Sequence, residues 1–287
     1  MTKPIGLATF AVTALLALPL AADDAGCAAC VWESHETIGH HAIAVDDLDT
    51  AEAAFASALE VAERFRAGDR RLIESLGDLA LVARRRGDAE SEFDFRRRAL
   101  AAIDDAGERL AFERLYGNEA AVEALDTLGR DGESEPYRLA ALDDRRALFG
   151  PDDPELAVYL LDLASHYREM GRIDDAIAAA EKAAAVRLGF ADEDDRPYAA
   201  ALDILARLYV AAGRDAEAAG ALASVLAIDE KHLGTDHVFV AGVIEQYVPI
   251  LRRLGRDAEA DDLEWRAMDI RARSEAPMRA QPSPETQ

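Results

Sequence analysis

Apolar and small residues recur along this chain with helical spacing, and the pattern repeats every 42 residues. Each repeat contains a glycine at a fixed position, and an apolar or small residue lies eight, seven and four positions before it. Leu163, Ala164 and Tyr167, which precede Gly171, are one such set. These steps place the residues on one face of a helix, helix A. A glycine then ends helix A in the left-handed conformation. The boundary glycines are Gly87, Gly129, Gly171, Gly213 and Gly255.

A second amphipathic stretch, helix B, follows each glycine. Alanine recurs twelve positions beyond the glycine, at Ala99, Ala141, Ala183 and Ala267, with Val225 as the exception. Each unit is therefore a helix hairpin, and hairpins of this kind stack because one alone cannot bury its apolar faces. Asp153 and Asp195 precede later A helices and are expected to cap them, with Pro154 in a first turn. The two-residue alternation of strands is absent, so the sequence predicts an all-α fold.

The repeat resembles the tetratricopeptide repeat, and is most similar to the 42-residue variety of the kinesin light chain type. The residues that carry the resemblance are Leu163-Ala164-x-x-Tyr167-x-x-x-Gly171-Arg172-x-x-x-Ala176, then Ala183. The resemblance implies a right-handed α-solenoid of stacked helix-turn-helix repeats over residues 47–273. It also implies binding of a protein or peptide partner on a concave face lined by the A helices. The asparagine pairs that such repeats commonly carry on helix A are absent here.

The A-helix face opposite the buried stripe follows an i, i+4, i+7 spacing. It supplies the predicted partner-binding residues, although an ordinary solvated face would show the same pattern. These residues are Glu119, Glu123, Asp126, Leu161, Ser165, Arg168, Asp203, Arg207, Glu245 and Arg252.

The amino terminus has the pattern of a secretory signal peptide. Lys3 precedes an apolar run that ends in Ala21-Ala22, where small residues meet Asp23. This predicts cleavage after residue 22 and a periplasmic or secreted protein. An uncleaved anchor and a lipid on Cys27 are less favoured alternatives. A Cys- and His-containing segment, residues 23–46, would then precede the repeats, and a disordered tail, residues 274–287, would follow them.

Cys27 and Cys30 are the only cysteines. In an oxidising compartment they are expected to form a disulfide in a flexible segment. A redox role is less favoured, because the βαβ context of redox Cys-x-x-Cys motifs is missing. The histidines His35, His40 and His41 follow, with the five-residue step from His35 to His40 unlike the four-residue step of a zinc-protease helix. Together with the cysteines they form a weak candidate set for zinc or copper, and no metal site is assigned.

The formal net charge of −24 disfavours nucleic acid and anionic lipid surfaces as partners. No nucleophile stands with an orienting base, and His166, His232 and His237 are isolated, so neither an enzyme nor a cofactor is predicted. The leading hypothesis is an exported scaffold that binds a protein or peptide. The alternative is a metal-binding or thiol-redox function in the segment Cys27–His41, with the repeats as a docking arm. A role in self-assembly is a third hypothesis, since the oligomeric state is left open.

Overall fold

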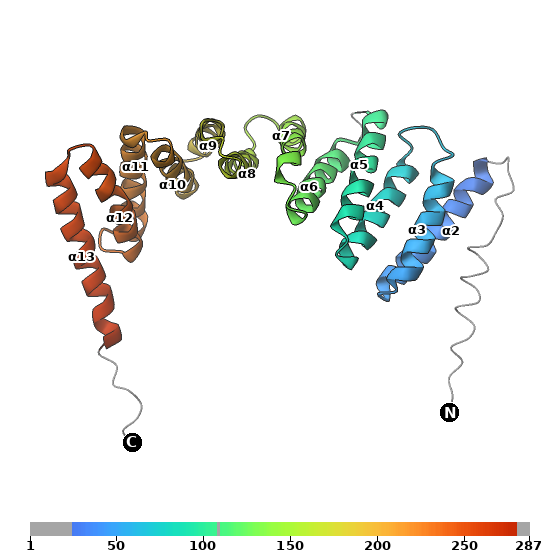
Figure 1. Ribbon diagram of the computed structural model, residues 1–287, viewed down its shortest axis with the longest axis horizontal. Helices are drawn as coiled ribbons and strands as arrows, with labels where there is room; N and C mark the ends of the chain where they lie inside the picture. The colour runs from blue at the N-terminus through green and yellow to red at the C-terminus, as the bar shows by residue number, and fades with distance from the viewer. Residues whose placement is uncertain (1–24, 108–109, 280–287) are drawn as a thin grey trace, which may run out of the picture. The chain divides into compact units, whose positions relative to one another are not determined.

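The computed structural model describes residues 25–107 and 110–279 of the chain (Figure 1). Within these ranges the regular elements are α-helices and the short 3-10 helix η2 (Asp131–Glu133), without a strand. The predicted signal peptide, residues 1–22, lies outside the described residues. The helices are α2 (Ala25–Ala44), α3 (Leu48–Ala62), α4 (Arg70–Arg86), α5 (Ala89–Ala106), α6 (Ala111–Thr127), α7 (Glu135–Phe149), α8 (Leu156–Glu169), α9 (Ile173–Leu188), α10 (Arg196–Ala211), α11 (Asp215–Leu233), α12 (Val238–Arg253) and α13 (Asp257–Arg279).

Consecutive helices pack in pairs along the chain. α2 packs against α3, α4 against α5, α8 against α9, α10 against α11, and α12 against α13. Neighbouring pairs also touch, through α3 and α4, α5 and α6, α9 and α10, and α11 and α12. This arrangement confirms the all-α fold of stacked helix hairpins that the sequence predicts.

The boundary glycines form the turn between helix A and helix B. All five have positive φ angles, such as 73° at Gly171 and 72° at Gly213. The next residue then donates its N–H back to a carbonyl in the last turn of helix A, as from Arg172 to Tyr167 at 2.8 Å. This is the Schellman termination, in which glycine adopts the left-handed conformation without a Cβ clash.

An additional pair, α2 and α3, precedes the first boundary glycine. Its turn uses Asp46, which has a φ of 59° although it is not a glycine. Gly39 of α2 lies directly against the ring of Phe55 of α3, so that a Cβ at this position would overlap the ring. Residues 25–44 are therefore a packed helix, rather than the flexible segment expected around Cys30.

The chain divides into two compact units between Leu148 and Phe149. Unit 1 comprises α2 to α6 and nearly all of α7, and unit 2 comprises α8 to α13. The core of unit 2 is one continuous apolar cluster, with Leu222, Ile244 and Leu251 at most 1% exposed. Unit 1 holds two smaller clusters, one around Phe55 and Leu76 and the other around Ile103 and Leu125.

The connectors before α8 and α10 follow the prediction only in part. Asp153 Oδ1 accepts the N–H of Glu155 at 3.1 Å, just before α8 begins. Asp195 occupies the N-cap position of α10, but its side chain makes no capping hydrogen bond. Asp194 caps instead by accepting the N–H of Arg196 at 3.0 Å. The predicted capping bond of Asp195 is wrong because this carboxylate contacts α11.

The last hairpin differs from its predicted form. α12 continues through Pro249, which lies inside the helix. α13 runs on to Arg279, beyond the predicted end of the repeats at residue 273, while residues 280–287 lie outside the described residues. Among the described helices, none combines the length and the apolarity that a membrane span requires.

Candidate functional site

The predicted binding residues of α6 are engaged with arginines of neighbouring helices. Glu123 forms an ion pair with Arg84 of α4. Asp126 forms another with Arg138 of α7, at 2.6 Å. Glu119 is half-buried. The face that reads as wholly acidic in the sequence therefore carries balancing positive charge from adjacent helices.

The predicted binding residues of α8 and α10 interact mainly within their own helices. Arg168 and Ser165 both contact Glu169, through Oε1, at 3.5 Å and 3.3 Å. Leu161 packs on the edge of the unit 2 core. On α10, Asp203 and Arg207 form an ion pair one helical turn apart.

A hollow of about 800 Å³ lies between α12 and α13, and two predicted binding residues line it. Glu245 pairs there with Arg271 at 2.8 Å, and Arg252 pairs with Glu264 at 2.6 Å. Met268, which is 59% exposed, contributes apolar surface. The hollow thus combines an apolar lining with charges of both signs.

Pro249 lines this hollow and also a smaller one, of about 230 Å³, between α10 and α12. Arg207 lines the smaller hollow as well. Because proline has no N–H, it removes the helical donor that the carbonyl of Glu245 would otherwise use. The structure therefore gathers Arg207, Glu245 and Arg252 around two adjacent hollows of unit 2, while the α6 residues belong to unit 1.

The arginines that follow the boundary glycines have a structural role that the sequence analysis misses. Each pairs with an acidic residue three positions later, which lies in η2 after Gly129 and in the first turn of helix B in the three later repeats. The pairs are Arg130–Glu133, Arg172–Asp175, Arg214–Glu217 and Arg256–Glu259. The same 42-residue step in the acidic residues is the signal that would have revealed these pairs.

Two of these arginines also lie over the ring of a tyrosine in the last turn of the preceding helix A. The guanidinium carbon of Arg172 is 4.3 Å from the centre of the Tyr167 ring, and that of Arg214 is 4.7 Å from Tyr209. Burial, together with a hydrogen bond to Glu181, raises the pKa of Tyr209 to about 12. These contacts fix the turn between the helices.

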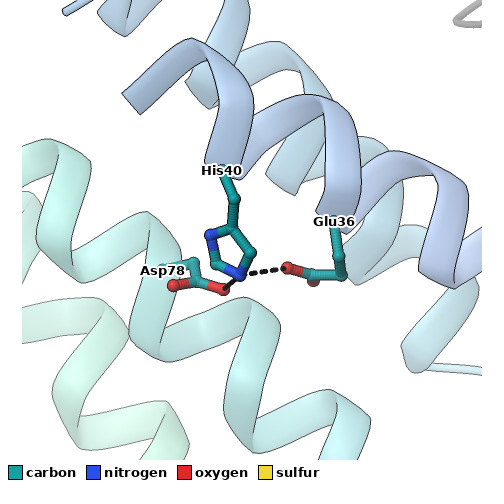
Figure 2. A group of neighbouring side chains, drawn as sticks. All are labelled: Glu36, His40 and Asp78. Atoms are coloured by element: carbon teal, nitrogen blue, oxygen red, sulfur yellow. Dashed lines mark ion pairs between the residues drawn. The ribbon is translucent and has the colours of Figure 1, made fainter. Parts of the chain in front are cut away.

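Three potential metal ligands converge between α2 and α4 in unit 1 (Figure 2). Glu36 and His40 stand one turn apart on α2, and Asp78 comes from α4. His40 Nε2 lies 3.9 Å from Glu36 Oε2 and 3.7 Å from Asp78 Oδ2. A four-residue step on one helix places two side chains on the same face, and α4 supplies the third.

Hydrogen bonds hold Glu36 in place from behind. The hydroxyl of Ser75 donates to Glu36 Oε1 at 2.6 Å, and the indole N–H of Trp32 donates to Ser75 Oγ at 2.9 Å. Burial raises the pKa of the Glu36 carboxyl, against the lowering effect of the Ser75 hydrogen bond. Burial also raises the pKa of Asp78.

The other cysteine and histidine candidates do not gather into one site. His35 is buried, whereas His41 and Cys30 are exposed. The side chain of Cys27 lies outside the described side chains, so the disulfide with Cys30 stays a prediction. Of the three histidines in the weak metal set, only His40 meets other ligand groups in the described part of the chain.

A second cluster, Asp194, Asp195 and His232, lies in unit 2. Its carboxylates already have cationic partners. Lys231 Nζ is 2.7 Å from Asp195 Oδ2, and Arg196 pairs with Asp194 at 2.8 Å. This cluster is an ordinary ion-pair network at the α10–α11 junction.

Comparison with known proteins fits the paired helices and the glycine turns. A sequence profile described as the tetratricopeptide repeat matches residues 112–189, and a second one matches residues 199–238. Residues 112–189 and 199–238 therefore contain tetratricopeptide repeats. The resemblance drawn from the spacing of Leu163, Tyr167 and Gly171 is thereby confirmed.

Solved structures share the tetratricopeptide repeat fold. The kinesin light chain TPR-like repeats of Podosopora anserina are 20% identical with a TM-score of 0.54, and the match covers 73% of this chain and 99% of that one. BtubC (BKLC) from P. vanneervenii is 19% identical with a TM-score of 0.53, over 84% and 96% of the two chains. Likeness at these identities shows the fold alone. A comparison with curated proteins gives no match.

Proposed function

We propose that this chain is an exported scaffold that binds a protein or peptide partner on the A-helix faces of its tetratricopeptide repeats. The observation that carries the proposal is the pair of adjacent hollows around Pro249 in unit 2. Their apolar and charged lining suits a partner that inserts an apolar side chain flanked by charged groups.

The ion pairs around the larger hollow favour exchange with a partner. Glu245 and Arg271 are 48% and 42% exposed, and Arg252 and Glu264 are each 46% exposed. Exposed pairs of this kind contribute only about 0–1 kcal/mol each to stability. A partner can therefore replace these ion pairs at a small cost in free energy. Because each pair has one positive and one negative side chain, the hollow repels neither a cationic nor an anionic group of the partner.

Export belongs to the same proposal. It rests on the apolar run after Lys3 and the small residues before Asp23, which have the order of a signal peptide. The proposed location is the periplasm or the exterior of the cell. Sequencing the amino terminus of the mature protein tests this part, because an intact Met1 on the cellular protein would contradict cleavage.

A metal or thiol-redox centre in the segment Cys27–His41 is not favoured as the principal function. α2 packs into the repeats, and only His40 among its histidines meets ligand groups in the described residues. Catalysis is not proposed either, since the charged groups of the hollows are held in ion pairs of ordinary geometry.

Affinity capture from an envelope extract tests the binding proposal, with the immobilised chain compared with two charge-reversed variants. Glu245→Lys alters the larger hollow and is expected to lose the captured partner. Asp262→Lys changes the charge of α13 by the same amount but does not line the hollow. It is expected to retain the partner. Equal capture by both variants would contradict the proposed site, and repetition at high salt separates electrostatic from apolar recognition.

A further inference from the structure

The arrangement of Glu36, His40 and Asp78 has the composition of a three-ligand metal site. It offers one imidazole nitrogen and two carboxylate oxygens, a donor set that suits zinc. The His and Glu ligands share one face of α2, and the Asp ligand belongs to the packed neighbour α4 (Figure 2). Ligands taken from two helices would join the first hairpin of unit 1 to the second.

The distances between the ligand atoms are close to those around a zinc ion. With metal–ligand bonds of about 2.0–2.2 Å, two ligand atoms of a tetrahedral site lie about 3.3–3.6 Å apart. The observed separations from His40 Nε2 are 3.7 Å to Asp78 and 3.9 Å to Glu36. Small side-chain rotations would bring all three atoms to bonding distance of one ion.

Glu36 is oriented for such a role by its burial and its hydrogen bonds. Its side chain is 8% exposed. Oε1 of Glu36 accepts the hydrogen bond from Ser75. Oε2 is directed toward His40 and has no N–H donor at hydrogen-bond distance. Hydrogen bonds that fix a ligand from behind are typical of metal sites. His40, with 61% of its side chain exposed, lies on the solvent side and leaves an entry path.

The carboxylates of this cluster lack the cationic partners found in the second cluster. Among the described residues, no lysine or arginine forms an ion pair with Glu36 or Asp78. The two carboxyl groups hydrogen-bond each other, and Arg96 acts on Asp78 only through its nearby charge. By contrast, Lys231 and Arg196 neutralise the carboxylates of Asp195 and Asp194. Buried carboxylates are normally paired or coordinate a metal.

We propose that Glu36, His40 and Asp78 bind one zinc ion, with water completing the coordination, and that the ion fastens α2 to α4. The site is independent of partner binding in unit 2. Because the donors include a nitrogen, zinc is expected to bind in preference to magnesium, which favours oxygen ligands alone.

Isothermal titration with zinc chloride tests the site on the untagged full chain, with Cys27→Ser and Cys30→Ser in every sample to remove thiol ligands. The parent protein is expected to bind one zinc ion per chain. His40→Ala and Asp78→Asn are each expected to weaken binding by about tenfold or more. His41→Ala removes the exposed neighbouring imidazole and is the matched control, so its affinity should equal that of the parent.

Thermal unfolding supplies a second measurement. Zinc is expected to raise the Tm of the parent and of His41→Ala, but not that of His40→Ala or Asp78→Asn, with far-UV circular dichroism showing that each variant is folded. Lack of saturable zinc binding by the parent would overturn the proposal. So would affinities that His40→Ala and Asp78→Asn leave unchanged, or a magnesium affinity equal to that for zinc.

Discussion

The helices of unit 2 share one apolar core, in which residues such as Leu222, Ile244 and Ile270 form a continuous cluster. Unit 1 divides its core into two clusters. The polar residues that are buried in the described chain also lie mainly in unit 1. They are His35, Glu36, Ser75, Glu92, Asn118, Ser134 and Asp144, with His166 in unit 2.

The difference follows the regularity of the repeats. In unit 2 the 42-residue pattern recurs without interruption, and alanines such as Ala176, Ala218 and Ala260 are fully buried between helices. In unit 1 the turn after α6 contains the extra helix η2, and α7 is held to α6 by Arg114, Asn118 and Asp144. We conclude that unit 2 is built from regular repeats, whereas most of the buried polar side chains lie in unit 1.

The largest expected effect comes from a cavity in the continuous core of unit 2. Ile244→Ala removes a side chain that is 0% exposed and is expected to lower stability by about 4 kcal/mol. Hydrogen exchange followed by mass spectrometry should show the loss of protection within α8 to α13. Ile244→Val is the milder control, with an expected cost of about 1 kcal/mol. A loss spread equally over α2 to α5 would break the comparison.

The next effect concerns the buried polar contact of unit 1. Asp144 lies 2.6 Å from Arg114 and accepts a 3.2 Å hydrogen bond from Asn118. Asp144→Ala leaves both groups without this partner and is expected to cost about 3 kcal/mol, at the low end for a buried pair because Arg114 is 26% exposed. Urea unfolding monitored by circular dichroism measures the change. A cost below that of Ile244→Val would show that this contact does not hold α7.

A smaller change in stability is expected for Gly39→Ala, and its sign is opposite to that of most glycine-to-alanine substitutions in helices. Glycine to alanine normally stabilises a helix interior by about 0.5–1 kcal/mol. At Gly39 the new methyl group would overlap the buried ring of Phe55, so Gly39→Ala is expected to destabilise the chain by about 1–2 kcal/mol. Gly77→Ala on α4 is the matched control, because its Cβ would meet open space. Stabilisation by both substitutions would contradict the close approach of α2 and α3.

The smallest effect depends on pH and involves Glu92 of unit 1. Burial raises the pKa of this carboxyl, so its ionised form is disfavoured in the folded state. Glu92→Gln is therefore expected to stabilise the chain at pH 7. The gain should shrink as the pH falls through the raised folded pKa toward the ordinary carboxyl range, because the folded wild type gains its proton first. Urea unfolding of both proteins at several pH values measures the difference in unfolding free energy. A difference that grows as the pH falls would contradict a raised pKa of Glu92 in the folded state.

Local spacing predicts the repeats well because each boundary glycine adopts the same left-handed conformation at the end of a helix A. The stripe before Gly213 and the turn at Gly213 both depend on neighbours within one hairpin, which a sequence displays directly. The α2–α3 pair is missed since Asp46 replaces the glycine of its turn, and Gly39 resembles a helix breaker until Phe55 is placed beside it.

The candidate sites are less predictable because they depend on contacts between distant segments. Asp78 joins Glu36 and His40 only through the packing of α4 on the first hairpin. The acidic set on α6 likewise changes character once Arg84 and Arg138 reach it from other helices. The spacing does identify Glu245 and Arg252, which line one hollow, but the partners Arg271 and Glu264 come from α13.

Hydrogen exchange of the full chain with and without its captured partner is the most direct test of the proposal that the A-helix face of unit 2 binds a protein or peptide. We predict increased protection in α12 and α13 around Pro249, with little change in α2 and α3. Protection confined to α2 to α5, or unchanged exchange throughout α10 to α13, would contradict the proposed binding surface.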